Sequence, residues 1–253
     1  MCLIACAWRA HPDYELVLAA NRDEFHERPT LAAAAWQDAP DVHGGRDALQ
    51  GGGWLAVSAR RRLAAVTNVR RMQEPDPSAP SRGALVADFV RGNVSARAQA
   101  ERLTATAERY AGFNLLLWDG DALVYVSNQP TVTVRVLPPG IHAVSNAQLE
   151  TPWPKLRRLR TSLETVCREA GEPAPLWQTL ADTTPPDDDE LPDTGVGLET
   201  ERFLAPPFIR GRSYGTRAST LVWSRAGRLT LEERRFGPDG IAQGHTQLAL
   251  PAP

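Results

Sequence analysis

The sequence predicts an α+β protein in which helices are layered on antiparallel sheets. Segments with strand-like composition occur in runs of several, and helical segments fall between those runs. A parallel sheet would instead require single strands to alternate regularly with helices. The length of 253 residues, of which 42% are hydrophobic, is enough for a sizeable core, and we predict a single domain over residues 1–253.

The chain begins with a predicted hairpin. Residues 2–8 are mostly apolar, His11-Pro12-Asp13 is a turn signal, and residues 14–20 form a second apolar run. In a hairpin, the end of the second strand returns to the start of the first. We therefore expect the polar segment Asn21-Arg22-Asp23-Glu24 to lie beside Cys2.

The remaining elements follow from apolar spacing and from cap and turn residues. We predict strands at 54–59, 63–69, 113–118, 122–127, 131–136, 141–145, 221–224 and 229–236, and helices from Ser81 to Gly92, from Ser95 to Tyr110, over 155–170 and from residue 176. The helix over 155–170 is amphipathic, and its three arginines, at 157, 158 and 160, read as a solvated face. Lys155 is the only lysine of the chain, which we attribute to overall composition.

Two glycine-rich stretches lie before the strand at 54–59. Gly44-Gly45 and Gly51-Gly52-Gly53 lack the Lys-Ser/Thr ending of a phosphate-binding loop, and neither opens a helix. They favour a close approach of the backbone to a ligand or to another strand.

Composition excludes several classes of function. The net charge of −2 gives no electrostatic footprint for nucleic acid. No apolar run reaches the 18–20 residues that a membrane helix requires, so we expect no membrane span. Three cysteines without framework spacing and no signal peptide indicate the cytoplasm.

No metal or cofactor is expected. Cys2 and Cys6 lack a second Cys/His pair at ligand spacing. The acidic run over 187–190 reads as a solvated loop in a proline-rich segment.

Cys2 is the candidate nucleophile. A small residue at position 2 permits removal of Met1, after which one residue would carry both a thiol and a free α-amine. The amine, with a reference pKa of about 7.7–8.0, can act as a base for the thiol, whose reference pKa is about 8.5. The alternative is an ordinary buried cysteine in the first strand.

The Met-Cys beginning, the Asn21-Arg22-Asp23-Glu24 motif and the Gly52-Gly53-Trp54-Leu55 motif together resemble the NRDE family, also called the transport and Golgi organisation protein two family. The resemblance covers essentially the whole chain. It implies a four-layer αββα sandwich like that of N-terminal-nucleophile (Ntn) hydrolases. The nearest characterised branch is cholylglycine hydrolase and penicillin V acylase.

The resemblance to that branch also implies five catalytic residues. By this resemblance, Cys2 is the nucleophile, Asp23 contacts its amine, and Arg217 lies near the sulfur. Asn68 contributes its backbone to the oxyanion hole, and Asn146 contributes its side-chain amide. Where the branch has an arginine three residues before its aspartate, this chain has Ala20. We further expect Asn21, Arg22 and Trp54 to bind substrate, with Trp36 as another wall of an apolar pocket.

Two functions are compatible with these residues. The first is hydrolysis of a non-peptide amide bond in a small acylated substrate. The second is binding and trafficking of a lipid, acyl or haem ligand on a fold that has lost catalysis, because the resemblance links the family to lipid homeostasis and haem movement. The five histidines are scattered, and none stands out as a haem ligand. The oligomeric state is left open.

Overall fold

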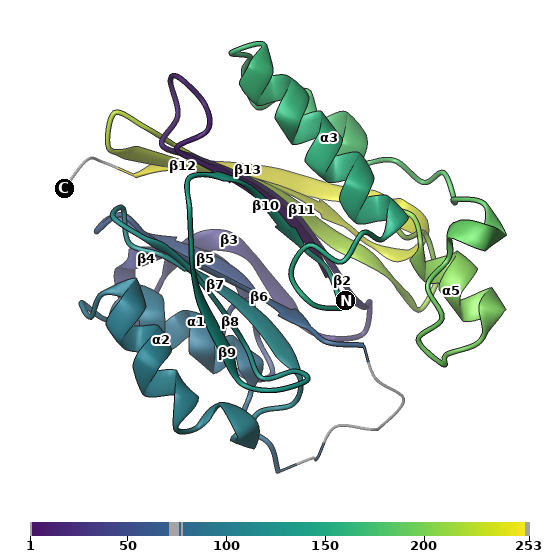
Figure 1. Ribbon diagram of the computed structural model, residues 1–253, viewed down its shortest axis with the longest axis horizontal. Coiled ribbons are helices and arrows are strands. Elements are labelled where there is room, and N and C mark those ends of the chain that lie inside the picture. The colour runs from purple at the N-terminus through teal and green to yellow at the C-terminus, as the bar shows by residue number, and fades with distance from the viewer. Residues whose placement is uncertain (1, 71–75, 77, 251–253) are drawn as a thin grey trace.

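Two antiparallel sheets pack face to face in the computed structural model, which describes residues 2–70, 76 and 78–250 (Figure 1). The six-stranded sheet has the order β10 (Gly140–Val144), β1 (Cys2–Trp8), β2 (Leu16–Phe25), β11 (Tyr214–Arg225), β12 (Arg228–Phe236) and β13 (Ala242–Leu250). The seven-stranded sheet follows chain order, with β3 (Thr30–Trp36), β4 (Ala39–Asp47), β5 (Leu55–Ser58), β6 (Arg62–Asn68), β7 (Phe113–Trp118), β8 (Leu123–Ser127) and β9 (Thr133–Leu137).

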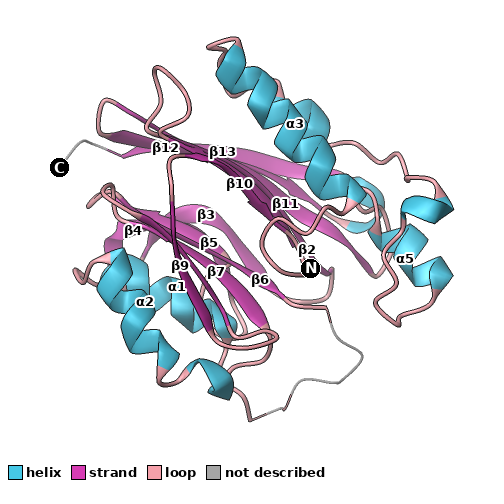
Figure 2. Cartoon of the chain, in the orientation of Figure 1, coloured by secondary structure: helices cyan, strands magenta, loops and turns pink. Residues whose placement is uncertain are grey.

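Helices cover the outer side of each sheet (Figure 2). On the seven-stranded sheet lie α1 (Arg82–Arg91) and α2 (Ala96–Thr104). On the six-stranded sheet lie α3 (Pro154–Arg168) and α4 (Leu176–Leu180), and α5 (Leu198–Leu204) lies on the same side of the molecule. The predicted four-layer αββα sandwich is therefore confirmed.

Strand β1 shows why its sequence is apolar at nearly every position. Ile4, Cys6 and Trp8 point into the core between the two sheets, whereas Leu3 and Ala5 pack against α3. Side chains alternate between the faces of a strand, so a strand that is covered on both sides needs apolar residues in both registers.

The N-terminal hairpin forms as predicted, and it fixes the geometry of the site. Strand β1 pairs antiparallel with β2, and Cys2 lies opposite Arg22 in that pairing. The segment over 21–24 therefore belongs to β2, and its last two residues extend past the start of β1.

Three strands and one helix escaped prediction. Strand β3 lies at the edge of its sheet, and its alanine-rich run is largely exposed. Strand β4 runs through Gly44 and Gly45, which have no side chains and so interrupt the alternation of apolar and polar residues. Strand β13 is largely exposed and polar, and its apolar signal is weak because it pairs only with β12 at the edge of the sheet. Helix α5 is short and follows an acidic, proline-rich segment, so its pattern spans fewer than two turns.

The second glycine stretch makes a close backbone contact, but its partner is the start of α1, not the ligand or strand that the sequence suggested. A Cβ at Gly52 would lie 2.4 Å from the carbonyl carbon of Gly83, near the start of α1. The Gly53 N–H donates to the carbonyl oxygen of Gly83 at 3.3 Å. Contact at this distance brings the first turn of α1 against the loop before β5.

We expect Gly52→Ala to destabilise the protein by about 1–3 kcal/mol, because the new methyl group meets backbone that cannot rotate away. The measurement is the free energy of unfolding in urea. Gly171→Ala is the matched control, since a Cβ there would meet nothing nearer than the Val166 carbonyl oxygen at 3.8 Å. Equal stabilities of the two variants would contradict this account.

Candidate functional site

A cavity of about 600 Å³ opens where β1, β2 and β6 reach the same end of the sandwich. Its polar wall includes Cys2, Arg22, Asp23 and Asn68. One further wall is formed by Trp54, in the loop before β5, and by Ser81, Arg82 and Gly83 at the start of α1. The other walls include Phe203 and Leu204 at the end of α5, Phe25 at the end of β2 and Tyr214 at the start of β11. We call it the Cys2 cavity.

Cys2 is partly exposed at the start of β1. Burial raises the pKa of its thiol, and the negative charge of Asp23 raises this pKa further. The cation of Arg22 and a hydrogen bond from the Asp23 backbone N–H both act in the opposite direction. The site therefore supplies groups that favour the thiolate, although burial outweighs them.

Asp23 lies on the face of β2 that is directed at the helices, one residue after the partner of Cys2. Its side chain is 1% exposed, and its Oδ1 accepts a hydrogen bond from Thr216 Oγ1 at 2.7 Å. The Thr216 hydroxyl oxygen in turn accepts from the Ile209 N–H at 2.9 Å. This chain of bonds fixes the carboxylate at the end of β2, close to Cys2.

Asn68 and Asn146 are in direct contact. Asn146 Nδ2 donates to both the backbone oxygen and the Oδ1 of Asn68, each at 3.0 Å. The neighbouring Ser145 Oγ donates to the Cys2 carbonyl oxygen at 2.9 Å. The Asn146 amide is thus used within the protein and positions Asn68, while Ser145 positions the start of β1.

Asn114 holds the segment over 145–147 in place, and no pattern in the sequence predicts this role. Its Nδ2 donates to the carbonyl oxygens of Ser145 and Ala147 at 3.3 and 2.9 Å, while its Oδ1 accepts from Tyr125 at 2.6 Å. Asn114 is 1% exposed at the second position of β7, where only the tertiary fold reveals these partners.

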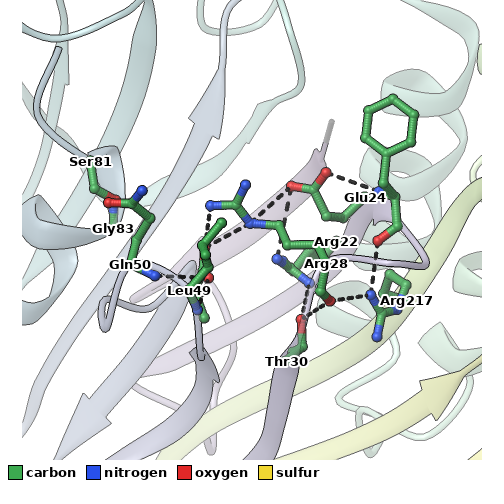
Figure 3. Close-up of polar contacts among 11 residues, drawn as sticks. Arg22, Glu24, Arg28, Thr30, Leu49, Gln50, Ser81, Gly83 and Arg217 are labelled. Atoms are coloured by element: carbon green, nitrogen blue, oxygen red, sulfur yellow. Dashed lines mark hydrogen bonds and ion pairs between the residues drawn. The ribbon is translucent and has the colours of Figure 1, made fainter. Parts of the chain in front are cut away.

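Arg22 occupies the space beside Cys2. Its guanidinium lies 4.4 Å from the centre of the Trp54 ring, donates to Thr30 Oγ1 at 3.1 Å and approaches Glu24 at 3.9 Å (Figure 3). Because Ala20 pairs with Ile4, further along the strand, an arginine there would not lie opposite Cys2.

Three of the predicted catalytic and substrate-binding residues do not line the Cys2 cavity. Asn146 lines a smaller cavity together with Arg70 and Trp153. Asn21 points to the helical side, where its Nδ2 donates to the carbonyl oxygens of Leu180 and Pro207 at 2.8 Å each. Arg217 donates to the carbonyl oxygens of Phe25 and Arg28 at 2.9 and 2.8 Å, and it lines a different cavity (Figure 3).

The displacement of Arg217 has a local cause. The pairing of β11 with β2 shifts by one residue between Thr216 and Ala218, which is a β-bulge. Thr216 consequently faces Asp23, and Arg217 turns to the loop after β2. Trp36 is also elsewhere: it is buried beneath α1, and its Nε1 donates to the Gly44 carbonyl oxygen at 3.1 Å.

Arg82 and Tyr214 are wall residues that sequence reasoning missed. Burial lowers the pKa of Arg82, and the charges of Cys2 and Glu24 oppose this effect. Burial, Asp23 and Cys2 all raise the pKa of Tyr214, so its hydroxyl stays protonated. A residue directly after a helix N-cap and another at the start of a late strand carry no pattern that would place them beside Cys2.

Within the described residues, no group of three or more His, Cys, Asp or Glu side chains is placed to hold a metal ion. None of the described helices is long and apolar enough to cross a membrane.

The chain is similar to known proteins over most of its length. Residues 1–238 match the sequence family described as Transport and Golgi organisation 2. The human Transport and Golgi organization protein 2 homolog is 34% identical, and the alignment covers 98% of this chain and 97% of the human protein. The bovine homolog is 35% identical, with 92% of each chain covered.

Solved structures support the fold. A C2A mutant of the conjugated bile acid hydrolase from Clostridium perfringens superposes with a TM-score of 0.52 at 7% identity, covering 98% of this chain and 92% of that one. The fold is thus of the Ntn-hydrolase type. The family match and the identity to the curated relatives together establish that this chain belongs to the Transport and Golgi organisation 2 family.

Proposed function

We propose that this protein is an Ntn-type cysteine hydrolase that cleaves the amide bond of a small acylated substrate, with Cys2 as the nucleophile. The observation that carries the proposal is the position of Cys2: it begins a strand at a cavity of about 600 Å³, with Asp23 and Arg22 beside it. The bile acid hydrolase with the same fold was studied as a C2A mutant, so cysteine at position 2 is common to both.

The reaction begins once Met1 has been removed. The Cys2 thiol gives its proton to its own α-amine, and the sulfur attacks the substrate carbonyl to form a C–S bond. The resulting ammonium lies next to Asp23, whose carboxylate stabilises it. The C–N bond then breaks, and the leaving amine takes that proton.

Water completes the cycle. The free α-amine accepts a proton from water, the oxygen attacks the thioester, and the acid departs as the thiol is restored. Arg22, beside Cys2, favours the thiolate in both steps.

The oxyanion can be stabilised by the backbone of Asn68. The Val69 N–H donates to the Gly112 carbonyl oxygen at 2.9 Å. Asn68, opposite Phe113, is therefore at a non-hydrogen-bonded position of the β6–β7 ladder, and its N–H points away from β7. The Cys2 cavity lies at this end of β6, which supports the oxyanion role carried over to Asn68.

A second candidate function is binding of an apolar or acyl ligand without turnover. Phe25 and Phe203 line the cavity although they are 52% and 41% exposed, and both pack near Tyr214. An aromatic rim of this kind suits a ligand that is carried, and the names of the relatives refer to transport. The Asn146 amide already donates to Asn68, which also favours binding without turnover.

Turnover distinguishes the two candidates. Protein shown by intact mass to lack Met1 should hydrolyse at least one member of a panel of acyl amides that varies in chain length and amine. Protein that retains Met1 is the control, and it should be inactive because its α-amine is displaced from the sulfur. If the processed protein hydrolyses no member and Cys2 reacts like an ordinary thiol, the binding function replaces the hydrolase.

A further inference from the structure

Four ionisable side chains are buried together on the helical side of the site. Asp23 and Lys155 are each 1% exposed, Glu201 is 3% exposed, and the Arg70 side chain is 6% exposed. Burying a charge is costly unless an opposite charge compensates it. The two cations and two anions balance one another.

Lys155 reaches the wall of the Cys2 cavity from the first turn of α3. Its Nζ donates to the Leu204 carbonyl oxygen at 3.1 Å, and Leu204 lines the cavity together with Cys2. One turn earlier in α5, Glu201 forms an ion pair with Arg70. The only lysine of the chain is therefore tied to the same helix end that forms part of the site.

The charges around Lys155 identify its counterpart. Burial lowers the pKa of Lys155 to about 8, and among the charges that act on it Asp23 has the largest effect, raising the pKa against burial. Arg70 lowers this pKa, while Cys2 and Glu201 raise it. Arg70 forms its ion pair with Glu201 and lies 4.7 Å from the centre of the Trp153 ring. The two cations of the cluster therefore have different partners.

We propose that Lys155 is a positioning residue of the Cys2 centre: its buried ammonium balances the Asp23 carboxylate and favours the Cys2 thiolate. This role rests on the proposed function, because it has consequences for catalysis only if the Cys2 sulfur reacts. Lys155 acts through Asp23 and through its charge, and it needs no contact with substrate.

The first test measures the charge of Lys155 directly. Protein labelled with ¹⁵N-lysine has a single side-chain amine signal, because the chain contains one lysine. We expect this signal to titrate with a midpoint of about 8. In Asp23→Asn the midpoint should fall by about one pH unit, since the neighbouring carboxylate is gone. Glu164→Gln, an exposed acid on the same helix, is the control and should leave the midpoint unchanged.

The second test measures the effect on Cys2. In protein lacking Met1, Lys155→Met should slow alkylation of Cys2 by iodoacetamide about 3- to 10-fold at pH 7, because the thiolate loses a nearby cation. At pH 10 the rates should converge, since Lys155 is then neutral in the unaltered protein. Lys155→Arg keeps the charge and should retain the rate at pH 7.

A midpoint near the ordinary lysine value of about 10.4, or one that Asp23→Asn does not move, would overturn the assignment. An alkylation profile of Lys155→Met that matches the unaltered protein would also overturn it. If Lys155→Met does not fold, the titrations of the unaltered protein and of Asp23→Asn decide the question. Neither measurement requires turnover, so a protein that hydrolyses nothing can still show the coupling.

Discussion

Cys2→Ser is expected to lower acyl-amide hydrolysis by the processed protein by at least about 10³-fold. A hydroxyl is far less acidic than a thiol, so the same α-amine cannot generate a comparable nucleophile at neutral pH. The side chains are nearly the same size, and Cys2 lies at the partly exposed start of β1, so the fold should be unaffected. The measurement is kcat/KM on whichever amide the panel identifies.

The two other cysteines supply the contrast. Cys6 is fully buried, and burial raises the pKa of its thiol to about 12, so it should not react near pH 7. Cys167 lies on α3 and is partly exposed, which makes Cys167→Ser the matched control. That variant should keep full activity. Unchanged hydrolysis by Cys2→Ser would show that the nucleophile is another group.

The largest effect on stability is expected at the buried Arg70–Glu201 ion pair. Arg70→Met should lower the free energy of unfolding by about 3–5 kcal/mol, because it leaves the Glu201 carboxylate, 3% exposed, without its cation. The double variant Arg70→Met with Glu201→Met should recover most of this loss, since both charges are then absent. Urea unfolding of the unaltered protein, of Arg70→Met, of Glu201→Met and of the double variant gives the coupling between the two sites.

A surface ion pair that involves Arg202, the residue after Glu201 in α5, provides the comparison. Arg202 and Asp188 form an ion pair with side chains 47% and 55% exposed. Solvent screens such a pair, so Arg202→Met should cost less than about 1 kcal/mol. A comparable loss in Arg70→Met would mean that the Arg70–Glu201 pair contributes no more than a surface contact.

The sequence by itself determined the N-terminal half of the site. Apolar runs and a turn at 11–13 define the hairpin, and antiparallel pairing within a hairpin is local, so Asp23 and Arg22 had to lie beside Cys2. Periodicity likewise located α3 and most strands, because each segment is covered on one or both faces by apolar core. The layered arrangement of the two sheets could be predicted only with the help of the resemblance to known folds.

Only the tertiary structure decided which distant residues join Cys2. The bulge before Ala218 turns Arg217 to another cavity, and the register of a strand cannot be seen in its composition. Lys155 looked like an incidental residue at the start of a helix, yet it is buried, and its Nζ donates to the carbonyl oxygen of Leu204 at the end of α5. Long-range register and the burial of charges depend on elements that are 130 or more residues apart, and no local pattern encodes them.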